Sequence, residues 1–262
     1  MFIPSLLQGQ VAVVTGGGTG LGLAIAKRLG ELGARIVIGS RGAANLERGS
    51  AALRLAGLDP LAVQVDVRNP EQVDEMVERT IRHFGHIDIL VNNAAGNFVC
   101  AAEDLSPNGW NAVIGIVLNG SFYCARAVGR HMIERGKGGS IVSILTNYVW
   151  TGSPGTIHSA AAKAGVMSMT QTLAAEWGRH RIRVNAVAPG PIESAGAARQ
   201  LWKTPEAVER ITAMVPLKRW GQPSEIADAV TFLVAPGTGY ITGEILTVDG
   251  GAWHGRGTFD FL

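Results

Sequence analysis

The sequence of 262 residues has little of several features that mark particular classes of protein. Only two cysteines are present, Cys100 and Cys124, which excludes a disulfide-rich scaffold and suits a reducing compartment. The formal net charge is only +2 and no basic cluster stands out, so we expect no nucleic-acid partner. The sequence has no run of about 18 uncharged apolar residues, so we expect no membrane span.

Targeting signals are also missing from the two ends of the sequence. Residues 1–10 have neither the cationic nor the apolar region of a signal peptide. Residues 259–262 read Phe-Asp-Phe-Leu, which differs from the Ser-Lys-Leu signal of peroxisomal proteins. We therefore expect a cytoplasmic protein.

Glycine is abundant instead. It occupies 35 of the 262 positions, about 13%, against a usual share of about 7%. Because 47% of the residues are hydrophobic, the chain has ample material for a buried core. The glycines therefore belong to a globular protein and need local explanations.

Short β-branched runs alternate with longer helical patterns along the chain. We expect strands at residues 11–15, 35–38, 61–65, 87–91, 140–145, 183–187 and 245–248. We expect helices at residues 20–32, 43–56, 70–84, 107–134, 157–177 and 223–234. Apolar strands in this alternation indicate a parallel sheet that is covered on both faces. The sequence predicts one α/β domain over residues 1–262, with a doubly wound, Rossmann-type sheet.

Residues 189–216 interrupt this alternation after the sixth expected strand. They carry a Pro-Gly-Pro sequence, a weak helical pattern at 195–202 and another helical pattern after Pro205. An irregular insertion at this place is either a substrate-binding flap or a simple surface excursion.

A glycine-rich turn at residues 15–22 joins the first expected strand to the first expected helix. Its spacing is Gly-x-x-x-Gly-x-Gly. Glycines at such a turn let a pyrophosphate approach the backbone N–H groups at the start of a helix. The turn predicts a dinucleotide site, and a purely structural turn is the alternative. The candidate cofactor-binding residues here are Gly16, Thr19, Gly20, Leu21 and Gly22.

The second expected strand ends in Ser40 and Arg41, with no carboxylate. An NAD site usually places Asp or Glu near this point to hold the ribose 2′-hydroxyl. A hydroxyl and a guanidinium suit a 2′-phosphate instead. The pair favours NADP(H), and an ordinary solvated arginine is the alternative.

Polar and small residues follow the third and fourth expected strands. Asp66 and Val67 are placed to reach an adenine at the carboxyl edge of the sheet. Asn92, Ala94 and Gly96 end the next strand at the same edge, where small residues let a cofactor approach. Ordinary strand-to-loop turns are the alternative for both groups.

Together these motifs resemble the short-chain dehydrogenase/reductase family over essentially the whole chain. The resemblance also includes Asn119, Lys163, the Pro189-Gly190 pair and the closing Asp249-Gly250-Gly251. That family usually has a tyrosine four residues before the lysine, and a serine about thirteen before that tyrosine. This sequence has Ser159 and Thr146 at those places.

A different tyrosine is available at Tyr148, eleven residues before Ser159 and just past the fifth expected strand. Only three tyrosines occur in the chain. The set Asn119, Tyr148, Ser159 and Lys163 resembles the 2,4-dienoyl-CoA reductase branch of the family. Longer segments carry the same resemblance, at residues 92–98, 105–110, 117–120, 174–178 and 189–192.

The resemblance implies a mechanism. NADPH would give hydride to the far end of a conjugated diene, and negative charge would flow to the thioester oxygen. The Tyr148 hydroxyl and the Asn119 amide would stabilise that oxygen, as in an oxyanion hole. Protonation near the thioester would give a 3-enoyl-CoA, a reaction of unsaturated fatty acid β-oxidation. Lys163 would hold the nicotinamide ribose, and Ser159 would position the substrate or Tyr148.

The resemblance also implies further contacts. Pro189, Gly190, Pro191 and Ile192 would lie beside the cofactor. Phe98 and Arg199 would contact the substrate, Arg199 at the phosphates of coenzyme A. A homotetramer is expected because relatives commonly form one. His131 and His158 have no Cys, His or carboxylate companions at ligand spacing, so we expect no metal site.

Other interpretations stay open. The chain would alternatively reduce a trans-2-enoyl-CoA or a carbonyl such as a 3-oxoacyl group, or bind NADP without catalysis. Each of the four central residues also has a purely structural interpretation. Tyr148 would pack in the core, and Ser159 would be a small residue chosen for close packing. Asn119 would make a structural hydrogen bond, and Lys163 would lie on the surface. Arg199 is alternatively an ordinary exposed arginine.

Overall fold

The computed structural model describes residues 2–193 and 204–254. Seven parallel strands form one sheet in the order β3-β2-β1-β4-β5-β6-β7. The strands are β1 (Val11–Thr15), β2 (Arg35–Ser40), β3 (Leu61–Gln64), β4 (Ile89–Asn92), β5 (Gly139–Ile144), β6 (Ile182–Pro189) and β7 (Ile245–Val248). The expected doubly wound parallel sheet is confirmed.

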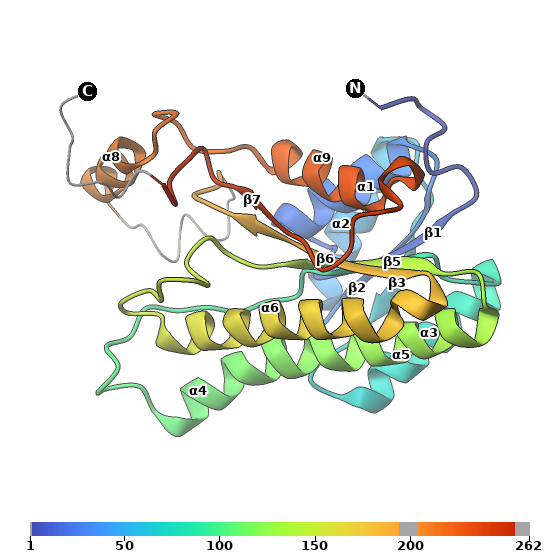
Figure 1. Cartoon of the computed structure of the whole chain (residues 1–262), viewed down its shortest axis with the longest axis horizontal. Coiled ribbons are helices and arrows are strands. Elements are labelled where there is room, and N and C mark those ends of the chain that lie inside the picture. Colours follow the sequence, from blue (N-terminus) through green and yellow to red (C-terminus); the bar gives the residue numbers. More distant parts are fainter. Residues whose placement is uncertain (1, 194–203, 255–262) are drawn as a thin grey trace.

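Helices cover both faces of the sheet. They are α1 (Gly20–Glu31), α2 (Ala43–Leu55), α3 (Pro70–Phe84), α4 (Pro107–Ile114), α5 (Gly120–Arg135), α6 (Ile157–Trp177), α8 (Pro205–Met214) and α9 (Pro223–Val234). Short helical turns lie at η1 (Gly115–Asn119), η2 (Gly178–His180) and η3 (Pro236–Thr238). Figure 1 shows α1, α2 and α9 on one face and α3, α5 and α6 on the other.

Alternate residues of each strand enter two different cores, as the period of a β-strand requires. On β1, Ala12 and Val14 pack toward α1 and α9, whereas Val11 and Val13 pack toward α3 and α5. All four are fully buried. This burial on both faces explains why the strands are continuous apolar runs.

The strand order reverses between β1 and β4. From β1 the chain builds outward through β2 to β3, and it then returns to place β4 on the other side of β1. In open parallel sheets, ligands bind beside the carboxyl ends of the strands at such a switch point. The glycine-rich turn after β1 lies at this point.

The expected helix at 107–134 is interrupted by a π-helical turn. The backbone N–H of Gly120 donates to the carbonyl of Gly115, five residues back, across η1. Gly115 and Gly120 border this turn, and glycine is a weak helix former. The turn ends at Asn119 and packs against α6, so the irregularity lies next to the helix that carries Ser159 and Lys163.

Within the described residues, one helical stretch, Pro107–Arg135, is long and apolar enough to cross a membrane by length and composition alone. Asn111, Asn119 and Ser121 interrupt its apolar residues, so it contains no run of 18 apolar residues. Half of its most apolar window is buried inside the fold. Its α5 part packs against α3. The stretch is therefore apolar because it is a helix of the protein core.

The two ends of the insertion after β6 are joined to each other. Ile192 and Gly221 form a β-bridge, and Gly221 donates its N–H to Pro191 O at 3.0 Å. The helix expected after Pro205 is present as α8, whose N-cap hydroxyl at Thr204 accepts from the N–H of Ala207 at 3.3 Å. The weaker helix expected at 195–202 lies outside the described residues.

Candidate active site

The glycine-rich turn is tied to the end of β4 through one buried hydroxyl. Thr15 Oγ1 accepts the backbone N–H groups of Asn93 and Ala94, each at 3.0 Å, and donates to Val91 O at 3.3 Å. The Asn93 side-chain amide donates back to Thr15 O at 2.9 Å. These bonds hold together the carboxyl ends of the two strands that flank the switch point.

We expect Thr15→Val to lower the free energy of unfolding by about 1–3 kcal/mol, because two partly buried N–H groups lose their acceptor. Thr15→Ser keeps the hydroxyl and should retain most of the stability. Urea unfolding of the three proteins measures the difference. Equal midpoints for valine and wild type would show that other groups satisfy these N–H donors.

Glycine is required inside this turn for a steric reason. A Cβ at Gly22 would lie 2.3 Å from Gly16 O, so the first helix could not approach the turn. Gly16 itself has φ +66°, a conformation that L side chains rarely adopt. The turn therefore stays close to α1, and Gly16 and Gly17 donate their N–H groups to Gly39 O at 2.7 and 3.3 Å.

A cavity of about 450 Å³ lies over this turn. Nine predicted cofactor residues line it: Gly16, Thr19, Gly20, Leu21, Ser40, Arg41, Asp66, Val67 and Ala94. Lining residues that the sequence did not single out are Gly39, Gly42, Asn45, Val65, Asn93, Ala95 and Ile116. The glycine-rich turn, the start of α1 and a cavity of this shape at the switch point fit a nicotinamide dinucleotide.

Asp66 is held at the cavity wall by Arg68. The guanidinium contacts the carboxylate at 2.5 Å, and this contact lowers the pKa of Asp66 below its usual value. The nearby positive charge of Arg41 acts in the same direction. Asp66 is therefore an ionised acceptor at the place where an adenine was predicted to bind.

Three predicted cofactor residues, one in the glycine-rich turn and two within residues 92–96, do not line this cavity. Asn92 is buried, and its amide donates to Ser121 O on α5 at 3.3 Å, so it does not line the cavity. Gly22 packs against the turn at Gly16, and a Cβ at Gly96 would lie 3.4 Å from Ile116. The neighbouring Asn93 takes the place at the cavity wall that was expected for Asn92.

The structure brings Tyr148 and Ser159 together. The Tyr148 hydroxyl lies 3.1 Å from the Ser159 hydroxyl, although eleven residues separate them. Lys163 follows Ser159 by one helical turn, and its ammonium group donates to Ile144 O at the end of β5. Full burial lowers the pKa of Lys163 to about 8. The bland alternative of a surface lysine is wrong, because only 6% of Lys163 is exposed.

A second cavity of about 510 Å³ is lined by Tyr148, by a majority of apolar side chains and by the polar residues Asn97, Thr146, Asn147, Ser153 and Thr156. Ile211 and Met214 of α8 contribute to its wall, together with Ile192. Leu21 lines both this cavity and the cofactor cavity, so the two meet there. A ligand in the second cavity would therefore lie beside a dinucleotide in the first.

Of the other predicted site residues, some line this second cavity and others do not. Pro189, Gly190, Pro191 and Ile192 line it instead of the cofactor cavity. Phe98 packs edge-on against the buried ring of His158, with centroids 4.4 Å apart. Asn119 lies at the end of η1 and is not among the lining residues. Arg199 lies outside the described residues.

Thr146 is a cavity residue that the sequence did not assign. It lines the second cavity, and its buried hydroxyl makes no hydrogen bond with any residue that the structure describes. The only sequence signal was its place thirteen residues before Ser159.

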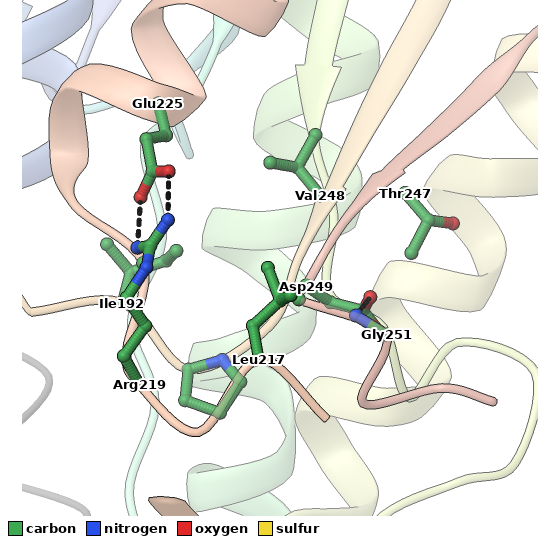
Figure 2. Close-up of a pocket in the computed structure, with 11 residues that line it drawn as sticks. Ile192, Leu217, Arg219, Glu225, Thr247, Val248, Asp249 and Gly251 are labelled. Atoms are coloured by element: carbon green, nitrogen blue, oxygen red, sulfur yellow. Dashed lines mark hydrogen bonds and ion pairs between the residues drawn. The ribbon is translucent and has the colours of Figure 1, made fainter. Parts of the chain in front are cut away.

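A third, smaller cavity of about 230 Å³ lies beside β7 (Figure 2). Arg219 projects toward it but forms two bonds to Glu225, at 2.7 and 2.9 Å. These bonds lower the pKa of Glu225 to about 2. Because the Arg219 guanidinium is already paired with Glu225, it is not available to bind a ligand in this cavity. We therefore interpret the cavity as a packing gap at the base of the insertion. In the described ranges 2–193 and 204–254, no three His, Cys, Asp or Glu side chains cluster as metal ligands.

Comparison with known proteins identifies the family. A family model described as enoyl-(acyl carrier protein) reductase matches residues 16–253. The crystal structure of a short chain dehydrogenase from Bacillus anthracis matches with a TM-score of 0.86 and 47% identity, over 94% of this chain and 97% of that one. The chain belongs to the short-chain dehydrogenase/reductase family.

Curated relatives within this family point to one branch of it. A probable 2,4-dienoyl-CoA reductase of Bacillus subtilis (strain 168), named as producing (2E)-enoyl-CoA, is 44% identical over 94% of this chain and 98% of that protein. A peroxisomal 2,4-dienoyl-CoA reductase of Arabidopsis thaliana, named as producing (3E)-enoyl-CoA, is 41% identical over 96% of this chain and 87% of that protein. The resemblance to this branch, inferred from the motifs, is confirmed.

Proposed function

We propose that the protein reduces a 2,4-dienoyl-CoA with NADPH. The observation that carries this proposal is the position of Tyr148. Its hydroxyl bonds to Ser159, at the place where the family usually has its tyrosine, and it lines an apolar cavity that meets the cofactor cavity at Leu21. The names of the curated relatives support the same reaction.

A bound NADPH supplies hydride to the far end of the conjugated diene. The side chains of this protein handle the charge that results. As the substrate gains electrons, the thioester oxygen becomes an enolate oxygen, and the Tyr148 hydroxyl donates a hydrogen bond to it. Asn119 is proposed as the second donor. Ser159 holds the tyrosine from the other side through the 3.1 Å contact.

Lys163 has a supporting role in this proposal. Its ammonium lies one helical turn from Ser159 and is fixed by the Ile144 carbonyl. In the proposal it holds the nicotinamide ribose, and its positive charge favours the enolate. No side chain in the described site is assigned as the proton donor to carbon, and water fills that role in the proposal.

The position of protonation decides the product. A proton added next to the thioester gives the 3-enoyl-CoA, which we propose, and a proton added at carbon 4 gives the 2-enoyl-CoA. The relatives are named for both outcomes. Proton NMR of the product formed in D₂O distinguishes them, because deuterium marks the protonated carbon.

NADP(H) is the proposed cofactor. Ser40 and Arg41 line the cofactor cavity at the end of β2, where no carboxylate is available for a free ribose hydroxyl. Gln64 donates to Arg41 O at 3.1 Å and so holds the backbone of this loop in place. Charge-assisted bonds from a guanidinium are suited to a 2′-phosphate.

We expect Arg41→Ala to raise the KM for NADPH about 10- to 100-fold, which corresponds to losing a bond to a charged group. The KM for NADH should hardly change, because NADH has no 2′-phosphate. Arg54→Ala, which removes an exposed arginine of α2, is the control and should leave both values unchanged. An equal effect of Arg41→Ala on both cofactors would contradict the 2′-phosphate role.

The function is tested by measuring NADPH oxidation with three acyl-CoA esters in parallel: a 2,4-dienoyl, a trans-2-enoyl and a 3-oxoacyl thioester. The proposal requires the dienoyl ester to be the best substrate. Turnover of only the enoyl ester would favour the activity in the family model's description. Turnover of only the 3-oxoacyl ester would indicate a carbonyl reductase, and no turnover would favour the inactive NADP-binding alternative.

We also propose a cytoplasmic homotetramer. Exposed apolar side chains at Phe122 on α5 and Ile157 on α6 support self-association. The half-exposed edge strand β7 supports it as well. Light scattering measures the assembly, and a monomeric mass at micromolar concentration would contradict it. Imaging of the tagged protein tests the location.

A further inference from the structure

The closing Asp249-Gly250-Gly251 sequence has no role in the mechanism above. Asp249 directly follows β7 and is 9% exposed. Its carboxylate accepts the N–H of Gly251 at 2.9 Å and the N–H of Trp253 at 2.7 Å. Figure 2 shows Asp249 and Gly251 close together past the end of this strand. These two bonds form the turn that follows β7.

A third bond reaches another part of the chain. The side-chain amide of Asn147, 102 residues earlier, donates to the Asp249 carboxylate at 3.1 Å. Asn147 also donates its backbone N–H to Pro189 O at 2.9 Å. The residue just before Tyr148 is therefore held by the ends of both β6 and β7.

An aromatic contact repeats this connection on the other side of Tyr148. The rings of Trp150 and Trp253 lie with centroids 5.0 Å apart and planes inclined by 51°. Residues 147 and 150 thus both contact the segment 249–253, and Tyr148 lies between them. The loop that carries Tyr148 is fastened to the turn after β7 at two points.

We propose that Asn147 and Asp249 are positioning residues for Tyr148. Their hydrogen bond fixes the loop so that the phenol stays between Ser159 and the apolar cavity. Asp249 acts through Asn147, because Asn147 lines the cavity of Tyr148 whereas Asp249 lines the small cavity beside β7. The kinetic part of this inference rests on the proposed function.

The pair can be inverted, which gives a sharp test. Asn147→Asp places two carboxylates at hydrogen-bond distance, so we expect kcat to fall about 100-fold, the scale of a displacement near 1 Å. The double variant Asn147→Asp with Asp249→Asn removes the repulsion and allows an amide-to-carboxylate bond in reversed order, although the N–H of Trp253 then loses its carboxylate acceptor. Its kcat should rise at least about tenfold above that of Asn147→Asp, which a direct role of the Asp249 carboxylate in the chemistry would not allow.

A second measurement does not depend on activity. The chain has only three tyrosines, so incorporation of 3-fluorotyrosine should give three ¹⁹F resonances. Tyr148→Phe identifies the resonance of Tyr148. We expect Asn147→Asp to shift or broaden that resonance alone, and the double variant to restore it. Asp228→Asn, which removes a carboxylate contact to Arg28 at 2.7 Å, is the matched control and should leave all three unchanged.

The two measurements separate the possible failures. If wild type does not reduce the dienoyl ester, the proposed function fails, and the ¹⁹F spectra still decide the positioning role. An unchanged Tyr148 resonance in folded Asn147→Asp would overturn the inference. So would a folded double variant that remains as slow as Asn147→Asp.

Discussion

Tyr148→Phe is expected to lower kcat for the dienoyl ester about 100- to 1000-fold, the usual cost of removing one donor from an oxyanion site. The phenol is the hydroxyl that Ser159 orients at 3.1 Å, and it lines the cavity that is proposed to hold the acyl group. The fall should appear in kcat and in kcat/KM alike, because the bond is strongest when charge develops on the thioester oxygen.

Binding and stability should change much less. Phenylalanine keeps the ring that packs in the cavity wall, so NADPH affinity and the melting temperature should stay close to wild type. Tyr240→Phe is the control, because Tyr240 is fully exposed and does not line any of the three cavities. A Tyr148→Phe enzyme with more than half of the wild-type turnover would remove Tyr148 from the mechanism.

Ser159→Ala offers a graded comparison. The tyrosine hydroxyl would remain, but it would lose the partner that orients it. We therefore expect a smaller fall in kcat, about tenfold, which matches the loss of one neutral hydrogen bond. Steady-state kinetics of Ser159→Ala and Tyr148→Phe would show which hydroxyl contributes more to kcat. A larger fall in kcat for Ser159→Ala than for Tyr148→Phe would assign the central role to Ser159.

The strands and most helices could be predicted from the sequence because their signals are local. Every residue of β1, and every residue of β5 after Gly139, is buried, which a sheet covered on both faces explains. The π-helical turn at Gly115–Asn119 could not be predicted, since it depends on how α4 and α5 pack against α6. Gly115 and Gly120 indicated where the helix would be irregular, but not that the irregularity would be a π-helical turn.

Site residues could be predicted where a motif places them on one strand end, and not where distant segments meet. Arg41 and Asp66 line the cofactor cavity as expected. The choice between Asn92 and Asn93 depended on the side-chain direction at the last residue of β4, which adjacent identical residues do not reveal. The bond from Asn147 to Asp249 joins positions 102 residues apart, and no local pattern encodes such a contact.

Lys163→Met is expected to abolish most activity while leaving the fold at least as stable as wild type. Burial lowers the pKa of Lys163 from 10.5 to about 8, so holding the charged group at pH 7 costs the fold about 3 kcal/mol. Methionine removes this cost. It also leaves Ile144 O without its donor, which costs about 1–3 kcal/mol. The stability gained by removing the buried charge therefore equals or exceeds the stability lost with the hydrogen bond.

The pH dependence of stability distinguishes this explanation from a general effect of the substitution. Between pH 8 and 10.5 the unfolded wild type binds more protons at Lys163 than the folded protein does, so wild-type stability rises with pH across this range. Methionine does not titrate. The stability of Lys163→Met relative to wild type should therefore be greatest near pH 7 and decline toward pH 10. A constant difference over this range would show that the buried ammonium is not destabilising, and that the lysine is kept at no cost to the fold.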